Sequence, residues 1–377
     1  MTNVLSAPST IRRILLPEGR VHPPCWDRGS HRHPSLHGQH FSEIPFLTNS
    51  ETRDYLITGG AGFIGSHLTE ALLARGNRVV SIDDLSTGRL RNVNHLMDDS
   101  NFSFIEADSS DERILDRYAL TETIIVHLAS AVGVRLITND PVHTIESIVM
   151  GTRAVLQCAA RLDCRVLLAS TSEAYGKGDN TPFREGDDSL LGPTSKSRWS
   201  YAASKLVGEF LGLAYHTQFG VEVVPFRLFN TIGPRQTGRY GMVVPRFVRQ
   251  ALLNDPITLY GDGLQTRTFC DVRDVVQALI GLALHSDSPG RIYNIGSGEE
   301  ISIRALAERI KGITKSRSDV AYVPYEKVYG RGFEDIRRRA PDTTRIRDLL
   351  GWQPTYSLDE TIEEIVKFEQ KEIQDKR

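Results

Sequence analysis

The stretch YLITGGAGFIG, residues 55–65, decides the fold of this chain. Its first four residues are typical of a short buried strand, and its glycines form a turn that leads into a helix with one apolar face. A glycine turn at a helix N-terminus lets the backbone approach a pyrophosphate, whose charge meets unpaired N–H groups and the helix dipole. We therefore predict a dinucleotide site on the following residues: Gly59, Gly62, Phe63, Ile64 and Gly65.

Short apolar segments recur after this stretch and alternate with amphipathic helical segments, which indicates a parallel sheet wound by helices. The predicted strands are 55–57, 79–82, 102–105, 124–126, 166–168 and 221–226. We predict an α/β fold with a Rossmann-type doubly wound parallel sheet and a smaller C-terminal substrate-binding lobe. The helices 244–253 and 303–310, among Gly-Pro turns, are assigned to that lobe.

The predicted boundaries follow from these patterns. Residues 1–52 carry Pro, His, Arg and Ser without apolar periodicity, and we predict a disordered extension there. The dinucleotide-binding domain is predicted over 53–231, with a returning segment near 266–292. The smaller substrate-binding lobe is predicted over 232–265 and 293–370.

Composition excludes several classes of protein. The chain has 377 residues and a net charge of −2, which argues against a nucleic-acid partner. Its four cysteines have no metal-binding spacing, so we expect free thiols, no metal and a cytoplasmic location. No apolar run approaches the ~18 residues that span a bilayer, so no membrane association is expected.

Two carboxylates follow predicted strands where a dinucleotide would bind. Asp83 ends the second strand, at the distance expected for the acid that binds the ribose hydroxyls. A carboxylate there repels a 2′-phosphate, so NAD is favoured over NADP, although Arg89 and Arg91 lie nearby. Asp108 follows the third strand, where it can bind the adenine amino group or cap a helix.

Tyr201 and Lys205 are four residues apart in a helical segment and therefore share one helix face. A phenol has an unperturbed pKa near ~10, so it acts as a base at neutral pH only when nearby positive charge stabilises the phenolate. Lys205 supplies such a charge. Thr171 follows another strand at the same sheet edge, and its hydroxyl can bridge Tyr201 and a substrate oxygen. His127 ends a strand and is expected to be buried rather than catalytic.

At these residues the chain resembles the extended short-chain dehydrogenases that act on nucleotide sugars, from about Arg53 to Phe368. The resemblance implies a homodimer through helices near 144–160 and 204–215. It also implies substrate contacts from Asn230, Arg235, Arg246 and Arg267, of which Asn230 and Arg267 would meet the diphosphate. One position departs from the family's pattern, because Ile148 stands where the family usually has Asn.

Members of this family share a first step, in which Tyr201 takes the proton of the C4 hydroxyl and hydride passes to NAD. The dehydratases carry an Asp-Glu pair after the catalytic Thr, whereas this chain has Ser172-Glu173. The UDP-glucuronate decarboxylases instead show Thr-Ser-Glu and an Arg three residues before the catalytic Tyr, which here is Arg198.

A second segment, 329–341, also looks like that of the decarboxylases, and its match makes Arg339 an active-site candidate. Arg198 and Arg339 would hold the substrate carboxylate, and Glu173 would orient water or the sugar. The alternative for Arg337 to Arg339 is a solvated or phosphate-contacting face.

UDP-glucuronate decarboxylation is the function that these matches favour, through a 4-keto sugar that loses carbon dioxide. A UDP-hexose or UDP-hexuronate 4-epimerase is the alternative, since Gly133-Val134-Arg135 resembles an epimerase loop. A 4,6-dehydratase and a non-catalytic NAD-sensing protein fit less well, because the expelling acid is missing and because both Tyr201 and Lys205 are present.

Overall fold

The large sheet has seven strands in the order β11-β6-β5-β4-β1-β2-β3, and all its pairings are parallel. The computed structural model describes residues 52–130, 140–178, 180–238, 242–329 and 335–375. The chain order reverses beside β1, as in a doubly wound sheet. The strands are β1 (Asp54–Thr58), β2 (Arg78–Asp83), β3 (Phe102–Glu106), β4 (Ile124–His127), β5 (Arg165–Thr171), β6 (Val223–Leu228) and β11 (Tyr293–Ile295). The predicted α/β class and Rossmann-type sheet are confirmed.

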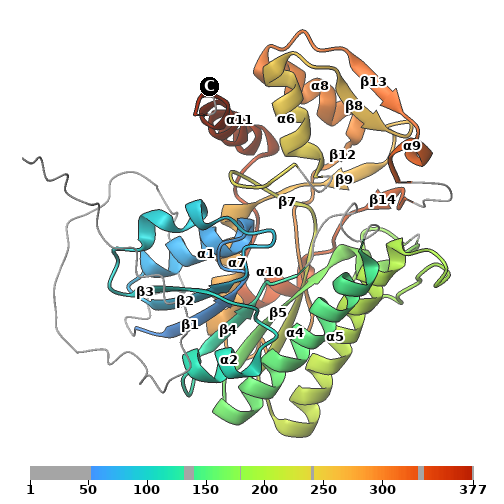
Figure 1. The fold of residues 1–377 in the computed structure, drawn as a ribbon. Helices are drawn as coiled ribbons and strands as arrows, with labels where there is room; N and C mark the ends of the chain where they lie inside the picture. The colour runs from blue at the N-terminus through green and yellow to red at the C-terminus, as the bar shows by residue number, and fades with distance from the viewer. Residues whose placement is uncertain (1–51, 131–139, 179, 239–241, 330–334, 376–377) are drawn as a thin grey trace, which may run out of the picture. The chain divides into compact units, whose positions relative to one another are not determined.

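Helices cover both faces of this sheet (Figure 1). They are α1 (Phe63–Leu73), α2 (Glu112–Tyr118), α4 (Pro141–Leu162), α5 (Arg198–Phe219), α7 (Val272–Leu284) and α10 (Thr344–Leu350). Three short 3-10 turns interrupt the connections: η1 (Leu90–Asn92), η2 (Asn94–Leu96) and η3 (Ser172–Tyr175). Helices α4 and α5 pack side by side on one face, and α1 and α7 pack together on the other.

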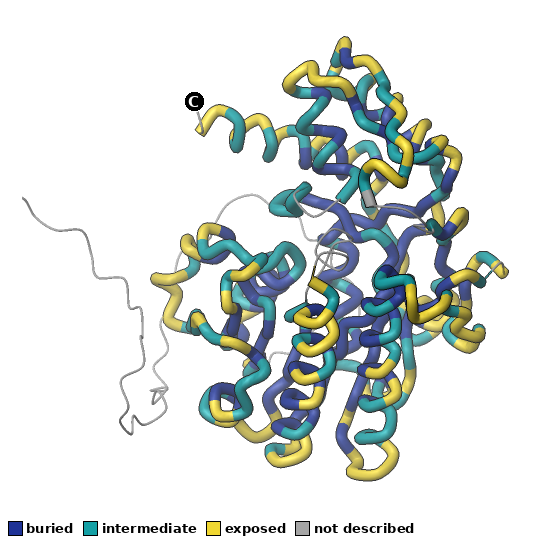
Figure 2. The backbone as a smooth tube through the Cα atoms, turned by 45° about the vertical axis from the view of Figure 1, so that its right-hand side comes forward, coloured by how far each residue is buried: buried dark blue, intermediate teal, exposed yellow. Residues whose placement is uncertain are grey.

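Alternation along each strand explains how one sheet fills two cores. Leu56 and Leu168 pack in the core that includes α2 and α4, whereas Ile57 and Leu167 pack in the core that includes α1 and α7. Successive side chains of a strand point to opposite faces, so a strand covered on both faces must be apolar throughout. Figure 2 shows the result, with buried strands inside and exposed residues on the outer helix surfaces.

A separate core forms among the remaining elements, around Phe247 and Leu306. Its helices are α6 (Val243–Leu253), α8 (Ile303–Thr314) and α11 (Leu358–Gln374), and α9 (Tyr325–Tyr329) is a short turn of helix nearby. The small strands are β7 (Thr231–Ile232), β8 (Ile257–Tyr260), β9 (Thr266–Thr268), β10 (Cys270–Asp271), β12 (Glu300–Ser302), β13 (Val320–Val323) and β14 (Arg338–Arg339).

One predicted boundary needs correction. Residues 293–370 were predicted to belong to the substrate-binding lobe, but β11 pairs with β6 in the large sheet. Ile346 of α10 and Trp352 also pack in the core beside α7. The reason is that α7 packs against this sheet, so the segment that follows it reaches the edge strand position beside β6. The predicted extension at 1–52 lies outside the described residues except for its last position.

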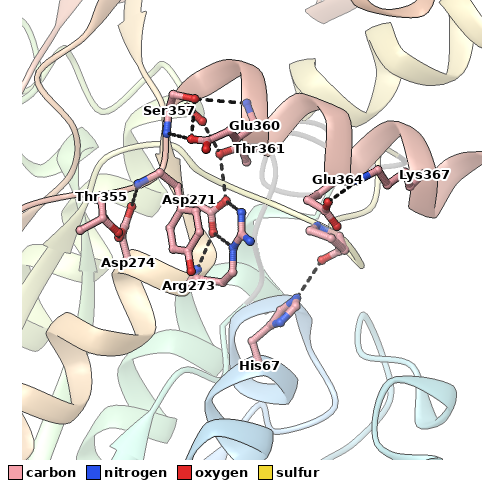
Figure 3. A network of polar contacts seen from close by, with 12 residues as sticks. His67, Asp271, Arg273, Asp274, Thr355, Ser357, Glu360, Thr361, Glu364 and Lys367 are labelled. Carbon is pink, nitrogen blue, oxygen red and sulfur yellow. Dashed lines mark hydrogen bonds and ion pairs between the residues drawn. The ribbon is translucent and has the colours of Figure 1, made fainter. Parts of the chain in front are cut away.

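A polar network ties α11 to the start of α7 (Figure 3). Asp271 accepts hydrogen bonds from Arg273 at 2.7 Å and from Thr361 at 2.8 Å, while Asp274 accepts from Thr355 at 2.8 Å. Ser357 and Glu360 form a capping box at the N-terminus of α11. These contacts fix the C-terminal helix against the segment that returns to the large sheet.

Within the described ranges, no helix combines the length and the apolar character needed to cross a bilayer. The described cysteines, Cys158, Cys164 and Cys270, are buried free thiols.

Candidate functional site

A cavity of about 590 Å³ lies at the carboxyl edge of the large sheet and extends to residues of β9, α9 and β14. Ligands of doubly wound sheets bind at this edge. Every predicted site residue lines the cavity: Gly59, Gly62, Phe63, Ile64, Gly65, Asp83, Asp108, Thr171, Glu173, Arg198, Tyr201, Lys205, Asn230, Arg235, Arg246, Arg267 and Arg339. Residues scattered over 280 positions of sequence are therefore brought to one place, although lining a cavity does not assign a role to each.

The glycine turn is packed too closely for larger residues. Gly59 has a φ of +74°, and a Cβ atom on it would lie 2.8 Å from the backbone nitrogen of Ala129. A Cβ atom on Gly65 would lie 2.2 Å from the carbonyl oxygen of Gly59. Gly62 is the N-cap residue of α1, so the open N–H groups of the helix face the cavity edge. The turn thus has the close backbone approach that a pyrophosphate requires.

Asp83 is held at the end of β2 by the backbone. Its carboxylate accepts hydrogen bonds from the N–H groups of Ala61 at 3.0 Å and Leu85 at 2.9 Å. Burial raises the pKa of Asp83, against these hydrogen bonds, which lower it. Asp108 is exposed at the cavity rim and accepts from Ser110 at 2.8 Å. The helix-cap alternative for Asp108 is wrong, because Asp111 is the N-cap of α2.

Tyr201, Lys205 and Thr171 all line the cavity. The ammonium of Lys205 donates to the carbonyl oxygen of Ala169 at 2.9 Å, and its burial lowers its pKa to about 8. Burial raises the pKa of Tyr201 well above its usual range, and the carboxylate of Glu173 adds to this rise. A hydrogen bond with Thr171 opposes the rise in the pKa of Tyr201. The phenol therefore needs added positive charge before it can act as a base.

Ile148, the residue that departs from the family's pattern, contacts the Tyr201 side chain. It lies on α4, is 1% exposed, and forms a small apolar cluster with Tyr201, which is 8% exposed. An apolar contact thus stands beside the phenol where an amide would bring a dipole. At this position, Ile148 of α4 therefore packs against Tyr201 of α5.

His127 is buried as predicted. Its ring lies 2.7 Å from the hydroxyl of Thr58 and 3.5 Å from that of Thr152. Burial lowers the pKa of His127 to about 3, and the charge of Lys205 adds to this effect. The ring is therefore neutral and packs behind the cavity.

Glu173 lies between two guanidinium groups. Arg339 donates to its Oε1 at 3.3 Å, and Arg198 lies 3.8 Å from its Oε2. Burial alone would raise the pKa of Glu173, but the charges of Arg198 and Arg339 hold it below its usual range. The carboxylate thus stays ionised at neutral pH beside Tyr201.

Asp335 also lines the cavity, although it was not among the residues predicted from the sequence. Its carboxylate accepts from Arg267 at 2.9 Å and from the hydroxyl of Tyr325 at 2.8 Å, and it lies 3.8 Å from Arg198. Burial would raise its pKa, but the charges of Arg267 and Arg198 lower it. The sequence signal that could have identified Asp335 was an acid next to an arginine run, in the segment that resembles the decarboxylases.

The buried cluster of Arg198, Arg267, Arg339, Glu173 and Asp335 therefore holds one positive charge more than negative. Burial lowers the pKa of Arg267 to about 10, and the charge of Arg339 adds to this. The Nε atom of Arg339 is buried and has no hydrogen-bond partner among the described residues. An added anion would complete the cluster.

The remaining predicted substrate residues are held by the protein itself. Asn230 donates to the carbonyl oxygen of Thr268 at 2.8 Å and accepts from Arg339 at 2.9 Å. Arg235 pairs with Glu70 of α1 at 2.6 Å. The guanidinium of Arg246 stacks 3.9 Å from the ring centre of Tyr260. All three are held at the cavity wall by contacts within the protein.

The last two predicted features are a loop and an arginine run. The epimerase-like Gly133-Val134-Arg135 lies outside the described residues. The alternative of a solvated face holds for two members of the arginine run: Arg337 pairs with Asp262 and Arg338 with Glu300, both on exposed side chains. Only Arg339 of the run lines the cavity. In the described ranges, no group of three or more His, Cys, Asp or Glu is placed to hold a metal ion.

Comparison with characterised proteins agrees with this geometry. The chain is 42% identical over 314 residues to a UDP-N-acetyl-alpha-D-glucosaminuronate decarboxylase of Bacillus cytotoxicus, covering 83% of this chain and 96% of that protein. It is 36% identical over 339 residues to UDP-glucuronic acid decarboxylase 1 of Danio rerio, covering 89% of this chain and 77% of that protein.

Solved structures share the fold at comparable coverage. A UDP-glucose 4-epimerase of Thermotoga maritima, solved with UDP-glucose, has a TM-score of 0.75 and 28% identity, covering 85% of this chain and 99% of that one. A dTDP-glucose 4,6-dehydratase of Streptomyces venezuelae, solved with NAD bound, has a TM-score of 0.76 and 31% identity, covering 84% of this chain and 97% of that one.

The family model described as GDP-mannose 4,6 dehydratase matches residues 56–365, which takes in the glycine turn, Tyr201, Lys205 and the arginine-carboxylate cluster. The family resemblance drawn from the motifs is confirmed, and the chain belongs to the GDP-mannose 4,6 dehydratase family of extended short-chain dehydrogenases.

Proposed function

We propose that this protein is an NAD-dependent decarboxylase of UDP-linked hexuronates, with UDP-glucuronate as the first candidate substrate. The observation that carries the proposal is the buried cluster beside Tyr201, in which Arg198 and Arg339 flank Glu173 and positive charge is in excess. A hexuronate differs from a neutral hexose by one carboxylate, and this cluster accommodates one more anion. The relatives with decarboxylase names support the same conclusion.

The residues present fit NAD. The glycine turn leaves no space for a Cβ atom on Gly59 or Gly65, and the carboxylate of Asp83 lines the same cavity where a ribose would lie. Gly59, Gly62, Phe63, Ile64 and Gly65 would hold the pyrophosphate side, Asp83 the ribose and Asp108 the adenine end. When bound, NAD accepts a hydride from the sugar and later returns it.

Tyr201 would accept the proton of the C4 hydroxyl, with Thr171 bridging its phenol and the sugar oxygen. The pKa of Tyr201, raised by burial, makes the nearby ammonium of Lys205 necessary for this step. Oxidation at C4 turns a hexuronate into a β-keto acid, which loses carbon dioxide because the electrons of the broken bond move into the ketone.

The carboxylate would be held by Arg198 and Arg339 before it leaves. Glu173, kept ionised by the same arginines, would orient water or the sugar while C5 regains a proton. Asn230 and Arg267 would meet the nucleotide diphosphate, and Arg235 and Arg246 would add further contacts to the substrate.

A second candidate substrate is UDP-N-acetylglucosaminuronate, favoured by the relative at 42% identity. It carries the same carboxylate and the same C4 hydroxyl, so the proposed chemistry is unchanged. A 4-epimerase remains the alternative reaction, because it needs only the C4 oxidation and room to turn the sugar.

The test is mass spectrometry of the product after incubation with each UDP-hexuronate and NAD. Loss of the mass of one carbon dioxide supports the decarboxylase. An unchanged mass with a new isomer would identify a 4-epimerase, and loss of one water would identify a dehydratase. No conversion of either substrate would reject the proposed substrate class.

We also propose the homodimer that the resemblance implies. Its support is the exposure of apolar side chains on α4 and α5: Met150 is 48% exposed, Val207 47% and Phe210 73%. A cytoplasmic location stays a prediction from the cysteine pattern.

A further inference from the structure

Three successive residues of β5 contact three residues of α5 that lie one helical turn apart. The carbonyl oxygen of Ala169 accepts from Lys205 at 2.9 Å, and Thr171 hydrogen-bonds Tyr201. Between them, the hydroxyl of Ser170 donates to the carboxylate of Glu209. Two of these contacts involve residues with a proposed role in the reaction, whereas the third involves a residue that has none.

Glu209 is also half of a buried ion pair. Its two carboxylate oxygens accept from Nε and Nη2 of Arg227 at 2.9 and 2.7 Å, and each side chain is 4% exposed. The Arg227 guanidinium stacks 4.5 Å from the ring centre of Tyr175, which follows the strand that carries Thr171. In the described part of the chain, neither member of the pair lines the cavity, so a direct contact with substrate does not explain them.

A buried ion pair is a weak source of stability, because removing two charges from water costs about as much as their attraction returns. The place of this pair offers a better reason for it. Glu209 lies one turn from Lys205 on α5, and its charge raises the pKa of Lys205 against the burial that lowers it.

Few other titratable groups face Lys205. His127 on β4 is neutral, because burial and the charge of Lys205 lower its pKa to about 3. Tyr201 shares the helix with Lys205, while the charged Glu173 and Arg339 act on Tyr201. Among the described residues, Glu209 is thus the carboxylate whose charge acts on the ammonium of Lys205.

We propose that Glu209, paired with Arg227, is a positioning residue on α5. It holds Lys205 and Tyr201 against β5 and places a negative charge behind the Lys205 ammonium. Arg227 binds both oxygens of that carboxylate and joins α5 to β6, three residues before Asn230. The reaction in which Lys205 acts is the proposed function, and the proposal rests on it.

The charge and the hydrogen bond can be removed separately. Glu209→Gln keeps the shape and an acceptor for Ser170 but removes the charge, whereas Ser170→Ala removes the hydroxyl and keeps the charge. The titration of Lys205 is followed by NMR of protein carrying ε-¹³C lysine with NAD bound, and Lys205→Arg identifies its signal.

We expect the pKa of Lys205 to fall by roughly one unit in Glu209→Gln and to stay unchanged in Ser170→Ala. The alkaline limb of kcat against pH should move to lower pH in Glu209→Gln and not in Ser170→Ala, because Lys205 in Glu209→Gln loses its proton at lower pH. Glu209→Asp should restore the position of this limb. In Ser170→Ala, kcat should fall with little change in KM.

A titration of Lys205 in Glu209→Gln that matches wild type would overturn the proposal. If the lone Arg227 charge prevents this variant from folding, the double variant Glu209→Gln/Arg227→Gln removes both charges, and the same NMR titration decides. The NMR readout does not depend on turnover, whereas the proposed function fails separately if wild type releases no carbon dioxide.

Discussion

Arg339 donates a hydrogen bond to Glu173 at 3.3 Å, although 166 residues of sequence separate them. The second nitrogen of the same guanidinium binds Asn230 at 2.9 Å, so one side chain joins a residue beside Tyr201 to one expected at the diphosphate. Its Nε atom is left without a partner among the described residues, and this is where the substrate carboxylate is proposed to bind.

Replacing Arg339 by Ala should lower kcat/KM for UDP-glucuronate by roughly 30-fold, because losing a charge-assisted hydrogen bond costs about 2 kcal/mol. Arg198→Ala should act in the same direction. The matched control is Arg338→Ala, whose side chain is 53% exposed and pairs with Glu300. Initial rates of carbon dioxide release measure the effect, and equal losses in Arg338→Ala and Arg339→Ala would contradict the assignment.

Tyr201→Phe should reduce turnover by at least about 100-fold while the affinity for the nucleotide sugar changes little, because only the proton-accepting oxygen is removed. Binding by calorimetry and product formation by mass spectrometry separate the two effects. Substantial activity in this variant would mean that another group is the base.

Ile148→Asn should move the acid limb of kcat against pH to lower pH. The reason is that burial raises the pKa of Tyr201, and an amide in place of the apolar contact makes the surroundings of the phenol more polar. Ile148→Val, which keeps an apolar contact at a cost of about 1 kcal/mol in stability, is the control and should leave the limb in place. An acid limb at the same pH in Ile148→Asn and wild type would refute this role.

Acid should destabilise the protein partly through His127. Its pKa is about 3 in the folded state, against 6.5 when unperturbed, so below 6.5 the unfolded state binds more protons. This contribution is present above pH 6.5 and is lost as the pH falls toward 3, with a slope of up to about 1.4 kcal/mol per pH unit. In thermal unfolding measured across this window, His127→Gln should be less stable than wild type at neutral pH but should show a shallower decline with acid. Parallel curves would rule out a neutral His127 as a cause.

The sequence by itself determined six of the seven strands of the large sheet and the glycine turn, and it predicted residues that line the cavity. Local patterns are sufficient there, because a strand covered on both faces must be apolar throughout and a pyrophosphate turn requires glycine at Gly59 and Gly65. That Tyr201 and Lys205 share one face of α5 likewise follows from their four-residue spacing and from helix geometry.

The tertiary structure alone decided which charges meet. Nothing in the sequence near Asp335 says that it accepts from Arg267, or that Glu209 pairs with Arg227, because ion pairs between distant segments depend on how the elements pack. For the same reason β11 was predicted in the wrong lobe, because the strand that a short segment pairs with is decided only when the chain folds. Burial, which sets the pKa of Tyr201, Lys205 and His127, is likewise a property of the packed protein and not of any local segment.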